Sequence, residues 1–212
     1  YSYDYSLSLG FGAFENSTYL QEVDLRFTGT KELPERCFYN CKSLNTVIPG
    51  RKLEVFGSMC FAFTNVSSIR IGAKITALGN YLFFGSQIEE ADMVAFPQET
   101  IPIGLFEGCR KISHVTLPAS LKTLSERCFC GSSIKEIVFP TGLNTILEKC
   151  FQYCDKLVTI NLSNTEVESF PNECFAHTSS LKNIIFPKRM RTLSTSVFFS
   201  SALESIVLPE KL

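Results

Sequence analysis

Residues 112–129 read ISHVTLPASLKTLSERCF, and residues 134–151 repeat the same pattern as IKEIVFPTGLNTILEKCF. Both stretches place aliphatic side chains at fixed positions, follow them with a proline, and end in a Cys-Phe pair. The shared phrase is L-x-x-I-x-L-P-x-x-L-x-x-L-x-x-x-x-F-x-x-C, and weaker copies of it occur along the chain. A pattern that returns at a fixed interval governs the fold, because each copy is one structural unit.

The number of copies follows from the phenylalanine that ends the phrase. Neighbouring copies are 22 to 24 residues apart, and the aligned rings are Phe14, Phe38, Phe61, Phe83, Phe106, Phe129, Phe151, Phe175 and Phe198. We therefore expect a single repeat domain over residues 1–212, with about nine repeats, that starts and ends within a repeat. Stable repeat arrays carry polar capping units, and neither end shows one, so we expect a piece or ordered core of a longer protein.

Each repeat predicts one coil of a solenoid. The L-x-x-I-x-L part alternates as a short strand does, and the following proline ends it. The next aliphatic residues return the chain across the opposite side of the coil, and the segment around the Phe has room for one short helical turn. Stacked right-handed coils would then place a parallel sheet on one face and a spine of Phe rings inside. The fifth repeat, with Pro97 and Pro102, should be distorted.

Composition excludes several classes of function. The chain has 212 residues, 45% of them hydrophobic and 19% charged, and a net charge of −1. So small a charge argues against nucleic acid or an anionic membrane as a partner. No apolar run approaches the roughly 20 residues of a spanning helix, so we expect no membrane insertion by this segment. The first residues also lack the basic region of a signal peptide.

The nine cysteines occupy repeated slots, which argues against a metal centre. Five directly precede the Phe and three follow it by three residues, in slots that hold Ala, Leu, Val, Ser or Thr elsewhere: Cys37, Cys60, Cys128, Cys150 and Cys174, then Cys41, Cys109 and Cys154. Buried, inert thiols are the favoured interpretation. Zinc bound by C-x-x-x-C pairs and a disulfide such as Cys128–Cys150 are the alternatives. Cys130 lies outside these slots and is the best candidate for an exposed, reactive thiol, although an unreactive surface residue is the favoured interpretation.

No other group of residues predicts catalysis or a cofactor. His114 and His177 fall in different repeats without a nucleophile beside them. Glu90 and Asp92 share the outward side of a strand and read best as a solvated acidic edge. Lys188, Arg189 and Arg191 form one basic loop without interleaved aromatic residues. Glycosylation acceptor patterns begin at Asn16, Asn65 and Asn161, and they matter only in a secreted eukaryotic protein. We expect a protein that is not an enzyme and needs no cofactor or metal.

The outward side of the predicted sheet is the candidate binding surface. One outward position per strand forms a row across the repeats, which together with His114 from the adjacent row makes up the candidate set: Asp24, Ile48, Arg70, Asp92, His114, Thr116, Val138, Asn161, Ile185 and Val207. The apolar members are β-branched, which suits a strand whatever its function. An exposed apolar strip is also typical of a protein-contact site.

The repeat phrase resembles the leucine-rich repeats of BspA-like surface proteins, a class found in bacteria and in some parasitic protists. The resemblance implies a leucine-rich repeat solenoid and a secreted or surface-exposed protein that adheres to matrix proteins or other cells. It implies a protein ligand and no catalytic residues. The alternative is an intracellular scaffold for protein–protein interaction, located in the cytoplasm, which free cysteines favour. Open ends of a solenoid could also pair with other copies.

Overall fold

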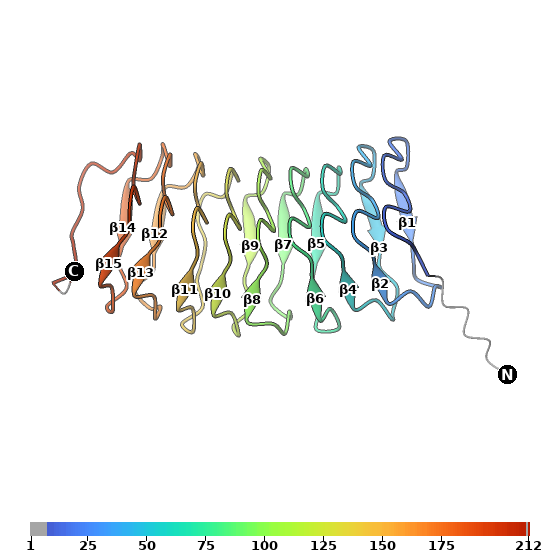
Figure 1. Ribbon diagram of the computed structural model, residues 1–212, viewed down its shortest axis with the longest axis horizontal. Helices are drawn as coiled ribbons and strands as arrows, with labels where there is room; N and C mark the ends of the chain where they lie inside the picture. Colours follow the sequence, from blue (N-terminus) through green and yellow to red (C-terminus); the bar gives the residue numbers. More distant parts are fainter. Residues whose placement is uncertain (1–7, 211) are drawn as a thin grey trace.

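The computed structural model describes residues 8–210 and 212, which form an elongated stack of coils (Figure 1). Each complete coil contributes a longer strand, a loop, a shorter strand and a turn that carries the aligned Phe, except that the coil of residues 134–151 has only the shorter strand. The longer strands are β1 (Glu22–Asp24), β3 (Thr46–Ile48), β5 (Ser68–Arg70), β7 (Glu90–Asp92), β9 (His114–Thr116), β12 (Thr159–Asn161) and β14 (Asn183–Ile185). The shorter ones are β2 (Glu32–Leu33), β4 (Val55–Phe56), β6 (Ala77–Leu78), β8 (Thr100–Ile101), β10 (Thr123–Leu124), β11 (Thr145–Ile146), β13 (Ser169–Phe170) and β15 (Thr192–Leu193).

The strand pairs are all parallel and keep the register of the repeat. Val23 lies opposite Val47, and Ala91 lies opposite Val115, as the sequence alignment requires. The predicted parallel sheet is therefore confirmed. The second line of short strands was not predicted, because two paired residues per repeat are too few to show an alternating pattern.

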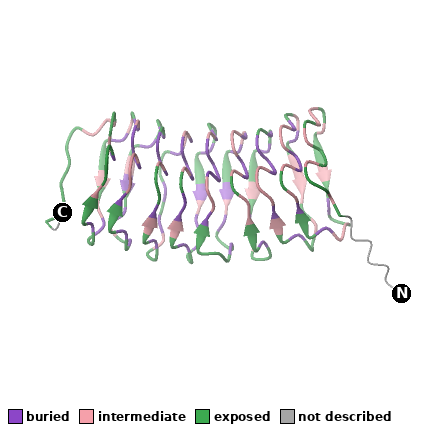
Figure 2. Ribbon diagram, viewed as in Figure 1, coloured by how far each residue is buried: buried purple, intermediate pink, exposed green. Residues whose placement is uncertain are grey.

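The predicted Phe spine is confirmed along its whole length. Consecutive aligned rings stack with centroids 5.3–5.8 Å apart, from Phe14 to Phe198. The seven inner rings are at most 1% exposed, whereas Phe14 is 38% exposed. Burial of each ring contributes roughly 1.5–3 kcal/mol, and the offset stacking adds to it. Buried residues recur in every coil, so the core runs the length of the stack (Figure 2).

The turn around each Phe is not the short helical turn that the sequence predicted. In every repeat the residues two before and two after the Phe adopt left-handed φ values, for example Arg127 at 56° and Gly131 at 66°. Two such residues within five prevent a helix. They turn three N–H groups towards the next coil instead: Arg127, Phe129 and Gly131 donate to the carbonyls of Glu148, Cys150 and Gln152 at 3.0, 2.9 and 2.7 Å. We call this inter-coil set of bonds the turn ladder.

The fifth repeat is distorted, as predicted. β6 and β8 lie in neighbouring coils but are not paired. In the regular coils the residue after the short strand donates back to the previous coil, as Gly79 does to the carbonyl of Phe56 at 2.7 Å. Pro102 occupies this place after β8 and has no N–H to donate.

Two further breaks in the strand lines also coincide with proline. Pro49 follows β3, which is not paired with β5, and Pro171 follows β13, which is not paired with β11. Residues 136–138 and 205–207 were expected to be strands and are not assigned as such; no proline lies within either segment. That residues 1–212 make up a single domain stays a prediction, and part of it, residues 1–7, falls outside the described residues.

Candidate functional site

The predicted row lies on the outward side of the longer strands and of residues 136–138 and 205–207, and its apolar members differ in exposure. Val138 is 84% exposed, Val207 87% and Ile185 47%, whereas Ile48, expected to be exposed, is half-buried. The most exposed pair, Val138 and Val207, lies in the two segments that do not complete a strand. The apolar strip is therefore concentrated in the C-terminal half of the stack.

Three polar members of the row bond to their own backbone. The side-chain oxygens of Asp24, Asp92 and Asn161 accept the N–H of the residue two positions on, at 3.0–3.1 Å. Such side-chain turns end the strand and start the loop. Asp24 also accepts from the Arg26 guanidinium, and that bond holds the pKa of the Asp24 carboxyl below its usual value. The bonds that these three side chains make to the backbone of their own loops are sufficient to explain their presence in the row.

The remaining polar members of the candidate set, Arg70, His114 and Thr116, lie on the middle strands β5 and β9. Arg70 on β5 lies 3.2 Å from the carboxylate of Asp92 on β7, an exposed pair of small energetic value. His114 on β9 is exposed, and Thr116 on the same strand is half-buried. The structure thus brings the predicted residues onto one face, with a charged middle and an apolar C-terminal half.

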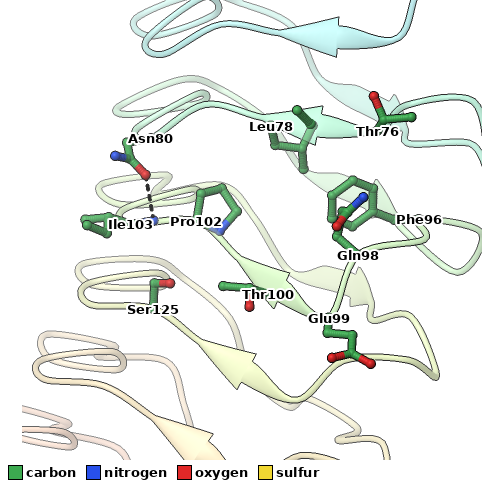
Figure 3. Close-up of a pocket in the computed structure, with 11 residues that line it drawn as sticks. Thr76, Leu78, Asn80, Phe96, Gln98, Glu99, Thr100, Pro102, Ile103 and Ser125 are labelled. Atoms are coloured by element: carbon green, nitrogen blue, oxygen red, sulfur yellow. Dashed lines mark hydrogen bonds between the residues drawn. The ribbon is translucent and has the colours of Figure 1, made fainter.

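Two hollows lie at breaks in the strand lines. The larger, of about 710 Å³, opens between β6 and β8, where Leu78 and Thr100 face the gap (Figure 3). It is closed towards the turn by the bond from the Ile103 N–H to the Asn80 side-chain oxygen at 3.2 Å. The hollow arises because β6 and β8 are not paired. Among the described residues that line it, Glu99 alone is charged, so charged groups do not converge there.

The second hollow, of about 340 Å³, lies beside the row at the break between β3 and β5. Its floor is apolar, with Leu53, Phe56 and Ile75, and its rim carries the cations Arg51, Arg70 and Lys74. In most other coils an aliphatic side chain follows the strand at the place that Pro49 takes. The missing aliphatic group and the missing pairing together leave this hollow.

All nine cysteines are buried free thiols. The cysteines that occupy the third position after the Phe also donate hydrogen bonds. The thiols of Cys41, Cys109 and Cys154 each lie 3.0 Å from the carbonyl oxygen of the Phe in the preceding coil. Thr64 and Thr178 in the same slot donate to the Phe carbonyl of their own coil at 2.8 and 2.7 Å. This slot therefore selects a small donor, which explains why Cys, Ser and Thr replace one another there.

The expectation that Cys130 is an exposed, reactive thiol is wrong. Its side chain is 5% exposed, and its thiol lies 3.9 Å from the side-chain oxygen of Gln152. Burial raises the pKa of Cys130 to about 11 and that of Cys109 to about 12. Since the thiolate is the reactive form, these thiols are unreactive at neutral pH.

The other candidate groups stay apart or are paired. His177 stacks on Tyr153 with ring centroids 4.5 Å apart, in the turns, whereas His114 is on the strand face. Arg189 and Arg191 of the basic loop pair with Glu166 and Glu168 of the previous coil. Among residues 8–210 and 212, no group of three or more His, Cys, Asp or Glu side chains is placed to hold a metal ion.

The comparisons with known proteins agree with this geometry. The family model described as BspA type leucine-rich repeat region (6 copies) matches residues 4–96 and 99–212. The chain belongs to this family. No curated protein matches it.

Among solved structures, this BspA-type chain is similar to a leucine-rich repeat protein from Bacteroides ovatus, with a TM-score of 0.78 and 26% identity. The match covers 91% of this chain and 49% of the other, so the chain spans about half the length of that protein. A leucine-rich cell surface protein from Faecalibacterium prausnitzii shares the fold, with a TM-score of 0.54 and 16% identity over 95% of this chain and 70% of the other. In the part of this BspA-type chain that the structure describes, no helix is long and apolar enough to span a membrane.

Proposed function

We propose that this chain is a non-enzymatic module that binds another protein through its strand face, as part of an adhesive protein at a cell surface. The observation that carries the proposal is the exposure of the apolar side chains Val138, Ile185 and Val207 on the outward side of the stack. Exposed apolar side chains gathered on a regular surface are typical of contact sites, and solenoids use such broad faces for recognition. The description of the Faecalibacterium prausnitzii neighbour as a cell surface protein supports the location.

The hollow at the β3–β5 break fits the same role. It offers an apolar floor with a cationic rim, which suits an apolar side chain of the partner flanked by acidic residues. Anchor residues that fill such pockets carry much of the affinity of protein interfaces. The partner we expect is therefore a protein with an acidic, partly apolar surface, such as a host matrix or cell-surface protein.

A charge placed on the strip tests the proposal. The double variant Val138→Glu, Ile185→Glu should lose binding in a screen of matrix and cell-surface proteins, because the partner would have to bury two unpaired carboxylates. Tyr19→Glu, Leu147→Glu is the matched control, since both residues are exposed apolar groups away from the row. Equal binding by the two double variants would remove the strand face from consideration.

The intracellular scaffold remains the second candidate, favoured by nine free thiols. Burial weakens that argument, because a thiol held in the core resists oxidation in any compartment. The complete gene decides between the two locations: a signal peptide ahead of this segment supports the cell surface, and a mature cytoplasmic start supports the scaffold.

A further inference from the structure

Three glycines in consecutive coils lie on the side of the stack formed by the turns around the Phe residues, away from the strand face. Gly85, Gly108 and Gly131 occupy the slot two residues after the Phe in three consecutive coils, all with left-handed φ. Other coils carry larger residues in this slot at the same φ: Asn16, Asn40, Phe63, Tyr153, His177 and Ser200. The backbone conformation therefore does not demand glycine here.

Space does not demand it at two of the three positions either. A Cβ on Gly108 or Gly131 would meet only the backbone of the neighbouring glycine, at 3.6 and 3.8 Å, which is ordinary contact. Only Gly85 is confined, because the Phe63 ring would lie 2.7 Å from its Cβ. Gly108 and Gly131, without side chains, line a groove of about 510 Å³, which we call the glycine groove.

Aromatic rings stand at both ends of the glycine groove. Phe84 lies at one end, held edge-on by Phe63 with centroids 5.1 Å apart. Tyr153 lies at the other end, 52% exposed, and His177 stacks behind it. These walls are three coils apart, roughly 14 Å at the usual strand spacing.

The polar groups of the groove balance in charge. Glu107, which is 8% exposed, bonds to the Arg127 guanidinium, and Arg110 and Asp155 add one charge of each sign at the rim. The floor has no backbone donors to spare: the N–H groups of Gly85, Gly108 and Gly131 bond to the next coil at 2.7–2.9 Å. An extended peptide could not add to this edge as a strand, and a polyanion would gain no net attraction.

We propose that the glycine groove binds a short neutral oligosaccharide. One sugar ring would place its apolar C–H face on Tyr153, where an exposed, braced ring offers a flat contact. The hydroxyls, which both donate and accept, would bond to Asp155 and Arg110, and bonds to charged groups are the stronger kind. A concave site with apolar walls and a few convergent polar groups is the usual form of a small-ligand site.

The test uses the whole chain with neutral trisaccharides of glucose, galactose, mannose and N-acetylglucosamine, by titration calorimetry and saturation-transfer NMR. At least one should bind. Gly108→Asn fills the groove with the residue that the first two coils carry in this slot, and Tyr153→Ala removes the stacking wall. Each should weaken binding about tenfold or more, equivalent to about 1.4 kcal/mol.

Ser200→Asn is the matched control, because it introduces the same residue in the same slot outside the groove and should leave binding unchanged. Circular dichroism checks the fold, and Tyr153→Ala decides the matter if Gly108→Asn unfolds. Absence of binding by every sugar overturns the proposal, as does binding that survives both variants. A sulfated trisaccharide and a short peptide are titrated in parallel, and tighter binding of either than of the neutral sugars overturns the ligand class. The strand-face variants should bind sugar normally, so either site can fail alone.

Discussion

The turns around the phenylalanines and the two lines of strands belong to the same coils, yet only the turns are bonded from coil to coil without interruption. The three bonds of the turn ladder recur at every junction from Phe14 to Phe198. The strand lines break up into sheets of two or three strands. Across the break between β6 and β8, Tyr81, Phe83 and Gly85 still donate to the next coil at 2.8, 3.1 and 2.9 Å.

The difference shows which part of each coil holds neighbouring coils together. Proline causes three of the strand breaks, because it removes a donor that each line needs once per coil. No proline occupies any of the three donor positions of the turn ladder in a described coil. The turns and the Phe spine therefore support the solenoid, while the strand lines tolerate gaps at which hollows form.

Loss of a spine ring should have the largest effect on stability. Phe129→Ala would leave a cavity between Phe106 and Phe151 and should lower the free energy of unfolding by about 3–5 kcal/mol. Val138→Ala, on the exposed strand face, should change it by less than about 0.5 kcal/mol. Urea unfolding followed by circular dichroism measures both, and similar midpoints for the two variants would contradict the asymmetry.

Alkaline pH should weaken the turn edge next, through its thiols. Burial raises the pKa of Cys109 to about 12, so the folded thiol stays protonated while the unfolded one ionises near pH 9. Its contribution is complete below about pH 9 and is lost as the pH rises towards 12, at about 1.4 kcal/mol per pH unit. Cys109→Ser places in this slot the hydroxyl that Ser86 and Ser132 carry in other coils. Unfolding midpoints at pH 8 and 10 should therefore fall less in the variant; equal falls would show that this thiol is not the cause.

A new break in a strand line should cost least. Ser125→Pro removes the bond from the Ser125 N–H to the Ile101 carbonyl, 3.2 Å long, at a slot where Pro102 and Pro171 already occur. We expect a loss of about 1 kcal/mol in the free energy of unfolding. Ser125→Ala, which keeps the N–H, should stay near the parent. A cost from Ser125→Pro as large as that of Phe129→Ala would mean that the strand lines carry the stack too.

Much of this contrast was within reach of the sequence. Nine phenylalanines at near-constant spacing predicted the spine, and the alternating aliphatic residues predicted the parallel strands. Pro49, Pro102 and Pro171 could also have predicted the breaks, since each falls where a ladder donor is needed. The left-handed turns were hidden, because residues as different as Arg127, Lys149 and Tyr153 adopt them.

The candidate site was predicted less completely. Alternation placed the row on the outward side, but it could not show that Asp24, Asp92 and Asn161 are used by their own turns. Cys130 was misjudged because its slot, directly after the Phe, holds Glu, Gln, Tyr, Ala or Phe in other coils, and so mixed a set gives no signal of burial. The glycine groove depends on three coils lying in contact, which one repeat read alone does not show.

Native-state hydrogen exchange tests the central claim most directly, because it reads the protection of single amides along the stack. The amides of Phe83 and Phe106, on either side of the gap at the fifth repeat, should exchange as slowly as those of Phe61 and Phe151. The amide of Thr100, which finds no partner on β6, should exchange much faster. If the amides of Phe83 and Phe106 exchanged as fast as that of Thr100, the stack would open at its strand breaks and the turn ladder would not be its support.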